Sequence, residues 1–253
     1  MPGLGSSASR GSLSDPALLH WFDELPSTQD EAHRLAAEGA PHGTAVAARV
    51  QTAGRGTRGR RWASEAGGLW MSVVCRPEGS ASLPVAGIRI GLALAELLSV
   101  PPLGQSAGPP VRVKWPNDLY LEDRKLGGIL CEARWQGDRV GWMVAGIGLN
   151  LHNPLPRETG VAAARLGDAG FAAAARELAP PVAQAVALAG RHAGPLDQSE
   201  LARFAARDWL RGRPVQAPRD GIVEGITPLG RLRIRAPDGT AVELEDSTAL
   251  RLL

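Results

Sequence analysis

A succession of short β-type runs between residues 111 and 150 constrains the fold of this chain more than any other feature. The runs are rich in β-branched and other apolar residues, and only short polar or glycine-containing connections separate them. Consecutive strands with such short connections pair as antiparallel neighbours, whereas parallel strands need long crossovers. We therefore predict a β-meander with a charged hairpin tip at Glu122-Asp123-Arg124. Its strands are expected at Val111–Trp115, Leu119–Leu121, Gly128–Trp135 and Val140–Asn150.

The residues before this block predict a mixture of helices and strands. Thr28, with Glu31 three positions later, has the pattern of a capping box in which Thr28 is the helix N-cap. This helix should end at Gly39, because glycine commonly follows a helix C-terminus. Strands are expected at Thr44–Val50 and Leu69–Cys75, a helix at Pro84–Ser99 and a surface connection at Pro101–Pro110.

The last part of the chain changes character at Gly212. Before it, Ala-rich segments between about residues 160 and 210 predict helices broken at Pro180-Pro181 and Gly194-Pro195. After it, short β runs between turn residues fit a small barrel-like domain. We therefore expect an α+β fold, a mixed β-sheet with flanking helices and a small C-terminal β barrel. The predicted parts are a flexible leader (1–14), a main domain (15–210) and a C-terminal domain (211–253).

Composition disfavours several classes of protein. The 253 residues are 44% hydrophobic and 21% charged, which allows a substantial core, and the net charge of +2 does not favour wholesale binding to nucleic acid or anionic lipid. We find no secretory signal or membrane-spanning stretch, so a cytoplasmic protein with no membrane partner is expected. Cys75 and Cys131 lack the spacing of a zinc site or disulfide framework, and we interpret both as buried apolar residues.

Lysine is rare in this chain. Of the 28 Lys and Arg residues only Lys114 and Lys125 are lysines, and a coding preference for Arg explains the others. A position that stays Lys is a candidate for needing a compact ammonium in place of a planar guanidinium.

The Arg/Gly segment, Gly54–Arg61, is a candidate anion-binding loop between two strands. Glycine lets the backbone approach a ligand, and Arg offers forked donors that match phosphate or carboxylate oxygens. The spacing fits neither a Walker A loop nor a dinucleotide-binding turn. Composition alone is equally compatible with a solvated linker or an RNA-binding patch.

Four other segments carry candidate functional groups, each with a structural alternative. The Asn-Asp of Lys114–Asp118 can address a nucleotide or a cation, or only its own turn. The lysine and glycines of Arg124–Leu130 can join two negatively charged reactants, or lie in solvent. The alternating glycines of Ala145–Asn150 let a ligand, or the protein's own core, pack flat on a strand. The hydroxyls of Ser27-Thr28 can meet a polar ligand, or cap a helix.

These segments, in this order, resemble the biotin protein ligase family. The matching motifs are STQDEA, QTAGRGTRGRRW, GLWMSVV, VKWPNDLYL, RKLGGILCE and GIGLN, between Ser27 and Asn150. The resemblance implies a biotin- and ATP-binding catalytic domain whose mixed sheet and helices resemble class II aminoacyl-tRNA synthetase cores, followed by an SH3-like barrel.

The resemblance also implies a two-step ligase reaction. The carboxylate of biotin attacks the α-phosphate of MgATP, and a lysine of a biotin carboxyl carrier protein or biotinyl domain then takes the biotinyl group. Lys125 and Arg55 are implied to be catalytic, because two anions must meet. Biotin-binding residues would be Ser27, Thr28, Gln29, Gln51, Arg55, Gly56, Thr57, Lys125, Gly127 and Gly128. ATP-binding residues would be Arg58, Arg60, Trp62, Lys114, Asn117, Asp118, Lys125 and Asn150, with Trp62 stacking on adenine; no metal ligands are assigned.

Two departures from the family pattern carry expectations of their own. The segment before Ser27 is too short for the winged-helix DNA-binding domain of bifunctional members, so we expect a monofunctional ligase that does not bind operator DNA. Thr57 stands where the GRGRxGR pattern usually has Arg, which predicts easier release of the adenylate, although the neighbouring Arg58 is in a position to compensate. A homodimer is left open.

Two rival interpretations remain. Lipoate protein ligases resemble this fold and also form an acyl adenylate, but GRGTRGRRW differs from their RRxSGGGxV pattern. A non-enzymatic RNA-binding module would use the Arg/Gly segment, its Trp neighbours and the small barrel. That interpretation leaves the isolated lysines and GIGLN unexplained.

Overall fold

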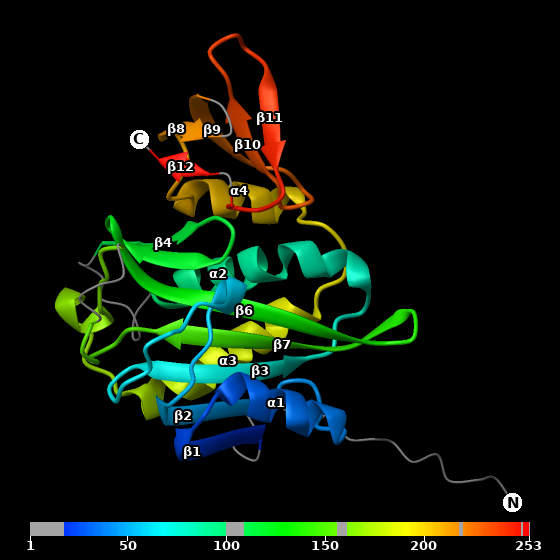
Figure 1. Ribbon diagram of the computed structural model, residues 1–253, viewed down its shortest axis with the longest axis vertical. Helices are drawn as coiled ribbons and strands as arrows, with labels where there is room; N and C mark the ends of the chain where they lie inside the picture. The colour runs from blue at the N-terminus through cyan, green and yellow to red at the C-terminus, as the bar shows by residue number, and fades with distance from the viewer. Residues whose placement is uncertain (1–17, 100–108, 156–160, 218–219, 249, 253) are drawn as a thin grey trace, which may run out of the picture.

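The computed structural model describes residues 18–99, 109–155, 161–217, 220–248 and 250–252, which contain two β-sheets and four α-helices (Figure 1). The larger sheet has seven strands in the order β1-β2-β3-β7-β6-β5-β4. Strands β1 and β2 are parallel and the other neighbours are antiparallel, so the sheet is mixed. Its strands are β1 (Leu19–Leu25), β2 (Ala45–Gln51), β3 (Leu69–Cys75), β4 (Val111–Lys114), β5 (Asp118–Leu121), β6 (Arg124–Gln136) and β7 (Arg139–Leu149).

The predicted β-meander is confirmed by β4 to β7, which pair in sequence. The hairpin of β6 and β7 is the longest of the sheet and extends beyond the other strands at one end (Figure 1). In its register Gly128 lies opposite Gly148, and Leu130 lies opposite Gly146. Because side chains two residues apart share a face of a strand, these glycines leave room for other side chains to pack on one face of the sheet.

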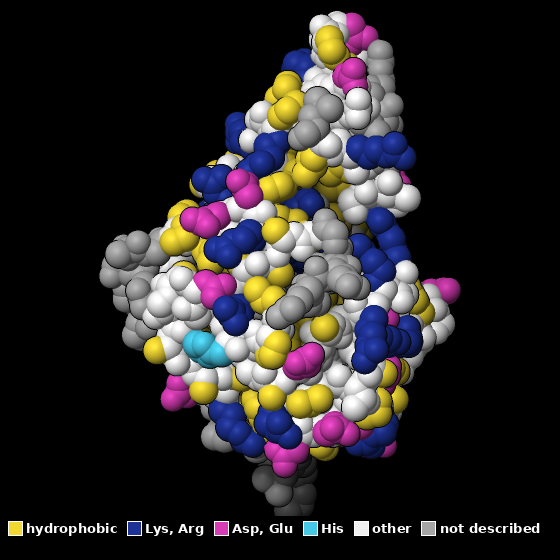
Figure 2. All heavy atoms as spheres, turned by 60° about the vertical axis from the view of Figure 1, so that its left-hand side comes forward, with side chains coloured by type: hydrophobic (Ala, Val, Ile, Leu, Met, Phe, Trp, Pro, Cys, Tyr) yellow, Lys and Arg dark blue, Asp and Glu magenta, His cyan; other side chains and the backbone are white. Residues whose placement is uncertain are grey.

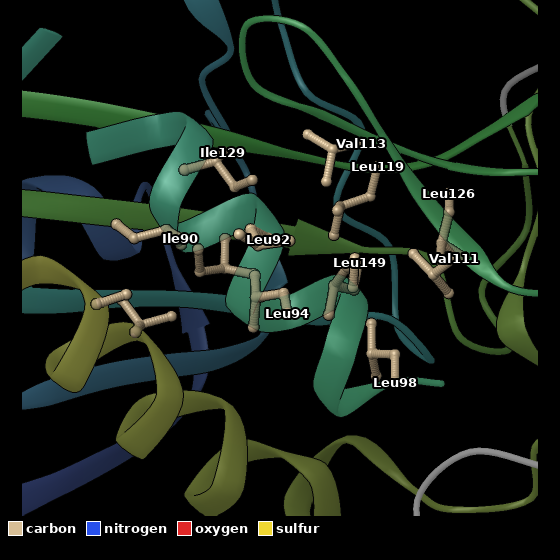
Figure 3. Packing of buried hydrophobic residues seen from close by; sticks show 14 of the residues in the cluster. Ile90, Leu92, Leu94, Leu98, Val111, Val113, Leu119, Leu126, Ile129 and Leu149 are labelled. Atoms are coloured by element: carbon tan, nitrogen blue, oxygen red, sulfur yellow. The ribbon is translucent and has the colours of Figure 1, made fainter. Parts of the chain in front are cut away.

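Helices cover both faces of the larger sheet. Helix α1 (Thr28–Ala37) lies on one face, where Ala32 and Ala36 pack in a small apolar cluster. Helices α2 (Ala86–Leu97) and α3 (Ala175–Arg191) lie on the other face, over the main core. Figure 3 shows side chains of α2 and the residue after it meeting those of the sheet. The labelled residues are Ile90, Leu92, Leu94, Leu98, Val111, Val113, Leu119, Leu126, Ile129 and Leu149.

The segment Ser80–Leu97, which joins the 3₁₀ helix η3 (Ser80–Val85) to α2, corrects one expectation. Its 18 residues have a mean hydropathy of 1.3, so by length and composition it could cross a membrane, contrary to the sequence-based view that no stretch could. In the structure 56% of this segment is buried, and α2 packs against strands β4 and β6 and against α3. The apolar residues of α2 are therefore those of a core helix.

The start of α1 corrects a second expectation. The N-cap is Ser27 and not Thr28, and the Ser27 side chain makes no capping hydrogen bond. Thr28 lies inside the helix, and its hydroxyl bonds with Gln51 and Ser72, which are distant in the sequence. Tertiary partners therefore replaced the local cap. The predicted end is confirmed, because Gly39 follows the helix with a φ of +95°.

Helix α3 corrects a third expectation, because it continues through Pro180-Pro181. Each proline lacks a backbone N–H and would weaken an isolated helix. Here Pro180 is exposed and Pro181 is half-buried, whereas Leu178, Val182 and Val186 on the opposite side are buried in the core. Burial of that apolar face outweighs the lost hydrogen bonds. The predicted break at Gly194-Pro195 is confirmed, and helix α4 (Gln198–Arg207) follows it.

The C-terminal residues form a five-stranded antiparallel sheet, which confirms the α+β fold. Its order is β11-β10-β9-β8-β12, and it packs beside α4 above the β4 edge of the larger sheet (Figure 1). The Trp115 indole donates to the Gly230 carbonyl at 2.7 Å, and Val223 and Leu232 join the main core cluster. Its strands are β8 (Pro214–Ala217), β9 (Gly221–Ile226), β10 (Leu232–Arg235), β11 (Ala241–Leu244) and β12 (Arg251–Leu252). The predicted leader and most of the connection at Pro101–Pro110 lie outside the described residues.

Candidate active site

A pocket of about 910 Å³ lies on the α1 face of the larger sheet, beyond the N-terminus of α1. Its wall includes the end of β2, the Arg/Gly segment, β3, β6 and β7, so segments far apart in sequence meet there. Most of the residues predicted to bind biotin or ATP line it. They are Ser27, Thr28, Gln29, Gln51, Arg55, Gly56, Thr57, Arg60, Trp62, Asn117, Asp118, Lys125, Gly128 and Asn150.

A network of buried amide and hydroxyl groups forms one end of the pocket. Gln51 Oε1 accepts from the Thr28 backbone N–H at 2.8 Å and from the Thr28 hydroxyl at 3.0 Å. The Thr28 hydroxyl lies 2.9 Å from Ser72 Oγ, which donates to Gln29 Oε1 at 3.0 Å. Gln51 Nε2 donates to Ser64 Oγ at 2.8 Å. These contacts hold donors and acceptors in fixed directions, as a ligand with a cyclic urea or amide would need.

Two buried polar atoms in the pocket wall, Ser27 Oγ and Trp62 Nε1, have no hydrogen-bond partner within the described part of the chain. A buried donor or acceptor left without a partner costs about 1–3 kcal/mol. A polar ligand that reached these atoms would remove that cost. Ser27 Oγ is therefore a position at which a polar ligand could gain a hydrogen bond without displacing one within the protein.

The Trp62 ring lies over glycines of β6 and β7. A Cβ added to Gly148 would stand 2.6 Å from Trp62 Nε1, and one added to Gly128 would stand 3.4 Å from the ring. A Cβ on Gly146 would meet Gln29 Oε1 at 2.5 Å. The alternating glycines therefore make room for Trp62 and Gln29, two side chains of the pocket wall.

Lys125 is fixed at the side of the pocket that holds Trp62. Its Nζ donates to Asp118 Oδ1 at 2.7 Å and lies 5.3 Å from the centre of a Trp62 ring. Backbone bonds to Ala162 and Ala164 hold it from the other side. Side-chain exposure is 21% for Lys125 and 23% for Asp118, so both reach the pocket without standing free in solvent. Lys125 thus presents a positive charge beside an aromatic surface.

Three predicted residues do not line the pocket, namely Arg58, Lys114 and Gly127. Arg58 Nη2 donates to Ser247 Oγ at 3.1 Å, in the loop between β11 and β12, so it joins the Arg/Gly segment to the C-terminal sheet. Gly127 has a packing role, because a Cβ there would stand 2.5 Å from the Gly148 carbonyl oxygen.

Lys114 packs on aromatic side chains away from the pocket wall. Its Nζ donates to the Tyr120 hydroxyl at 3.2 Å and lies 5.3 Å from a Trp209 ring centre. Burial lowers the pKa of Lys114 and raises the pKa of Tyr120 to about 12. The isolated lysines therefore have different surroundings, and Lys125 alone of the two lines the pocket.

Sequence reasoning missed Ser64 and Ser72, which complete the polar network. Ser72 is fully buried in a strand that is otherwise apolar, LWMSVVC, and that isolated hydroxyl was a usable signal. Ser64 has no comparable signal. Thr57 lines the pocket, and its hydroxyl accepts from Arg60 Nη2 at 3.1 Å. The effect of Thr57 on adenylate release stays a prediction.

The two cysteines differ in burial. Cys75 is buried as predicted, whereas Cys131 is partly buried, and burial raises both thiol pKa values, that of Cys131 to about 12. Within the described ranges no group of three or more His, Cys, Asp or Glu side chains could hold a metal ion.

Charge is mixed on the surface. In Figure 2 dark blue Lys and Arg side chains and magenta Asp and Glu side chains are both present over the face shown. Within the Arg/Gly segment, Arg55 is paired with Asp30 and Glu132, and Arg58 is paired with Asp246. Arg60 and Arg61 of the same segment bond with Thr57 and Thr52, so two of its four arginines are paired with carboxylates.

Comparison with known proteins gives the family. Residues 21–150 match the model of the biotin/lipoate A/B protein ligase family. The chain is 37% identical over 230 residues to a biotin–[acetyl-CoA-carboxylase] ligase of Paracoccus denitrificans, and the match covers 85% of this chain and 93% of that protein. The chain belongs to the biotin/lipoate A/B protein ligase family.

Other relatives agree with this assignment. The bifunctional ligase/repressor BirA of Bacillus subtilis is 40% identical over 144 residues, but the match spans only 43% of its length. The biotin protein ligase of Aquifex aeolicus in complex with biotin and ATP superposes with a TM-score of 0.70, at 26% identity, over 93% of this chain and 99% of that one. The prediction of a biotin protein ligase family member with that fold is therefore confirmed.

Proposed function

We propose that this chain is a biotin protein ligase, which activates biotin with ATP and transfers the biotinyl group to a lysine of a biotin carboxyl carrier protein or biotinyl domain. One observation carries the proposal. The buried amide and hydroxyl network around Gln51 and the Lys125 ammonium line the same pocket. An uncharged ring with a carboxylate tail would find partners for both of its ends there.

The polar network suits the ureido ring of biotin. That ring has a carbonyl acceptor and two N–H donors, and Ser27, Thr28 and Gln51 offer both kinds of partner. Ser27 Oγ is buried without a partner in the described residues, so it can bond with the ring at no loss to the protein. The carboxylate tail would then extend through the pocket toward Lys125.

Lys125 suits the first chemical step. A carboxylate oxygen of biotin attacks the α-phosphorus of ATP, the bond to the β-phosphate oxygen breaks, and pyrophosphate leaves. Both reactants are anions, so a fixed ammonium between them lowers the cost of the encounter. Asp118 holds Lys125 in place. Holding the two reactants close together lowers the activation free energy by several kcal/mol, on the order of 7–11 kcal/mol in the best-oriented cases.

Trp62 and Asn150 suit the nucleotide. Trp62 has a broad face beside Lys125, on which an adenine ring can stack, and Asn150 lines the same pocket. Mg²⁺ would enter with the ATP phosphates, because such ions take most of their ligands from phosphate and water and only one or two from carboxylates. Asp118 is the carboxylate beside Lys125 that could supply one of these, and the ion would neutralise charge on the leaving pyrophosphate.

The second step needs no nucleophile from the enzyme. The acceptor lysine amine attacks the carbonyl carbon of the mixed anhydride, AMP leaves, and the amine loses a proton. AMP is a good leaving group, so the task of the protein is to hold the adenylate until the acceptor arrives. We also propose a cytoplasmic enzyme that does not bind operator DNA, and a gel shift at low salt tests the latter.

Release of pyrophosphate with biotin and ATP tests the proposed function. We expect the wild-type chain to release pyrophosphate with biotin and not with lipoate. Lys125→Ala should reduce the rate of pyrophosphate release at least about a hundredfold, the size expected for loss of one preorganised charge. Lys125→Arg should restore little of this rate, because a guanidinium cannot take the same position as the ammonium. Pyrophosphate release with lipoate in place of biotin would make the chain a lipoate ligase.

A further inference from the structure

Arg55, at the start of the Arg/Gly segment, is held from two sides. Its Nη2 lies 2.7 Å from Asp30 Oδ1 on α1, and it donates to Glu132 Oε2 on β6 at 3.1 Å. Arg55 also lines the pocket. One guanidinium therefore joins a helix, a strand and the Arg/Gly segment at the mouth of the pocket.

Glu132 is itself oriented by a further pair of side chains. Its Oε2 lies 3.2 Å from His33 Nε2, and His33 Nδ1 accepts from the Trp142 indole N–H at 3.0 Å. An indole N–H can only donate, so Nδ1 carries no proton. The proton of neutral His33 must then be on Nε2, from which it is donated to Glu132. Trp142 and Glu132 thereby select the same tautomer of His33.

The surroundings of His33 keep it neutral. Burial lowers its pKa and the charges of Arg134 and Arg55 add to that effect, while Glu132 opposes it. Exposure falls from 39% for the Arg55 side chain to 26% for Glu132 and 11% for His33, so the contact becomes drier away from the pocket. A neutral His33 leaves the charge of Glu132 for Arg55.

We infer that Glu132, oriented by His33 and Trp142, is a positioning residue that fixes the Arg55 guanidinium at the mouth of the pocket, and this inference rests on the proposed function. Arg55 alone in the chain of contacts reaches the pocket wall. A side chain that must meet developing negative charge is more effective when its direction is set in advance. Two carboxylates and a neutral imidazole set that direction here.

A double-mutant cycle tests the inference. Glu132→Gln keeps the size of the side chain and removes its charge. We expect kcat for pyrophosphate release to fall about tenfold, while the KM for biotin changes less than twofold. A loss of this size is within the range that a misplaced group near the reacting atoms causes. In an Arg55→Lys background, Glu132→Gln should cause little further loss, because the effect acts through Arg55. Glu38→Gln is the matched control, since it removes a carboxylate of an exposed ion pair with Arg34 at the other end of α1 and should leave kcat unchanged.

A second measurement does not depend on activity. Long-range ¹H–¹⁵N NMR spectra of the wild-type chain should show His33 as the Nε2–H tautomer, which the contacts with Trp142 and Glu132 both require. Equal losses from Glu132→Gln in both backgrounds, or an Nδ1–H tautomer in the wild type, would overturn the inference. Absence of pyrophosphate release by the wild type would refute the proposed function, whereas the NMR result would still decide the arrangement around His33.

Discussion

Gly146 and Gly148 show how single residues determine the shape of the pocket. They are two positions apart on β7 and face the same side, and each lies under a different pocket side chain, Gln29 or Trp62. Gln29 belongs to the polar network and Trp62 to the Lys125 side. One added methyl group at each glycine therefore perturbs a different end of the pocket.

The two glycines predict separable effects on the substrates. Gly146→Ala would place a Cβ 2.5 Å from Gln29 Oε1, so we expect the KM for biotin to rise at least about tenfold, equivalent to about 1.4 kcal/mol, with a smaller change for ATP. Gly148→Ala would displace Trp62 and should mainly raise the KM for ATP. Steady-state kinetics with each substrate varied in turn measures both. Gly79→Ala is the control, because its Cβ would meet no described atom within 4 Å. A pair of variants with the same kinetic profile would refute the division of the pocket.

A buried ion pair joins helix α4 to helix α2. Arg89 Nε on α2 lies 2.5 Å from Glu200 Oε1 on α4, and the two side chains are 5% and 6% exposed. Glu200 also accepts from the Asp197 N–H at the start of α4, which completes a capping box. Burial raises the pKa of Glu200, but its bonds with Arg89 and Asp197 lower it further, and the net shift is downward. The helix start and the helix packing thus share one carboxylate.

Removal of one partner of this pair should destabilise the protein strongly. Glu200→Gln leaves Arg89 buried without its counter-charge, and we expect a loss of about 3–5 kcal/mol in the free energy of unfolding. The exposed pair between Arg203 and Glu96, on the same two helices, is the matched comparison. Glu96→Gln should cost less than about 1 kcal/mol. Urea denaturation followed by circular dichroism measures both values, and similar losses for the two variants would contradict this view of the buried pair.

The elements that could be predicted from sequence were those set by local patterns. Strands β4 to β7 follow from short apolar runs with polar tips, and the end of α1 follows from Gly39. The errors arose where tertiary contacts decided the outcome. Thr28 bonds with Gln51 instead of capping its helix, and Pro180-Pro181 is tolerated because the opposite face of α3 is buried.

The site was predictable to a similar extent and for the same reason. The family motifs predicted most of the residues that line the pocket. Residue spacing alone could not have done so, because it does not show which segments meet in the fold. The arrangement of Arg55, Glu132, His33 and Trp142 was not foreseen, since His33 and Glu132 are 99 positions apart and no local pattern links them. The location of Lys114 away from the pocket likewise depends on Tyr120 and Trp209, whose proximity only the fold creates.

Two half-buried histidines, His33 and His42, tie the stability of the whole molecule to pH. His33 Nδ1 accepts from Trp142, and His42 Nδ1 accepts from the Arg76 backbone N–H at 3.1 Å, so each ring must lack a proton at Nδ1 in the folded state. Burial is the main reason that the pKa of each is lowered. The unfolded chain therefore binds protons more readily than the folded chain at these two positions.

The sign of the pH dependence follows from that difference. Where the unfolded state binds more protons, stability rises with pH, so the contribution of His33 and His42 is complete above the ordinary histidine pKa of about 6.5 and is lost as pH falls through their lower folded values. Asp208 acts in the opposite direction, because burial raises its pKa to about 6 and the folded state then binds its proton more readily.

Comparison with variants separates the effect of the histidines from that of Asp208. Between pH 7.5 and 5, we expect urea denaturation to show a smaller loss of stability for His42→Gln than for the wild type, and a steeper loss for Asp208→Asn. Parallel pH profiles for the wild type and His42→Gln would mean that the histidine does not titrate with unfolding.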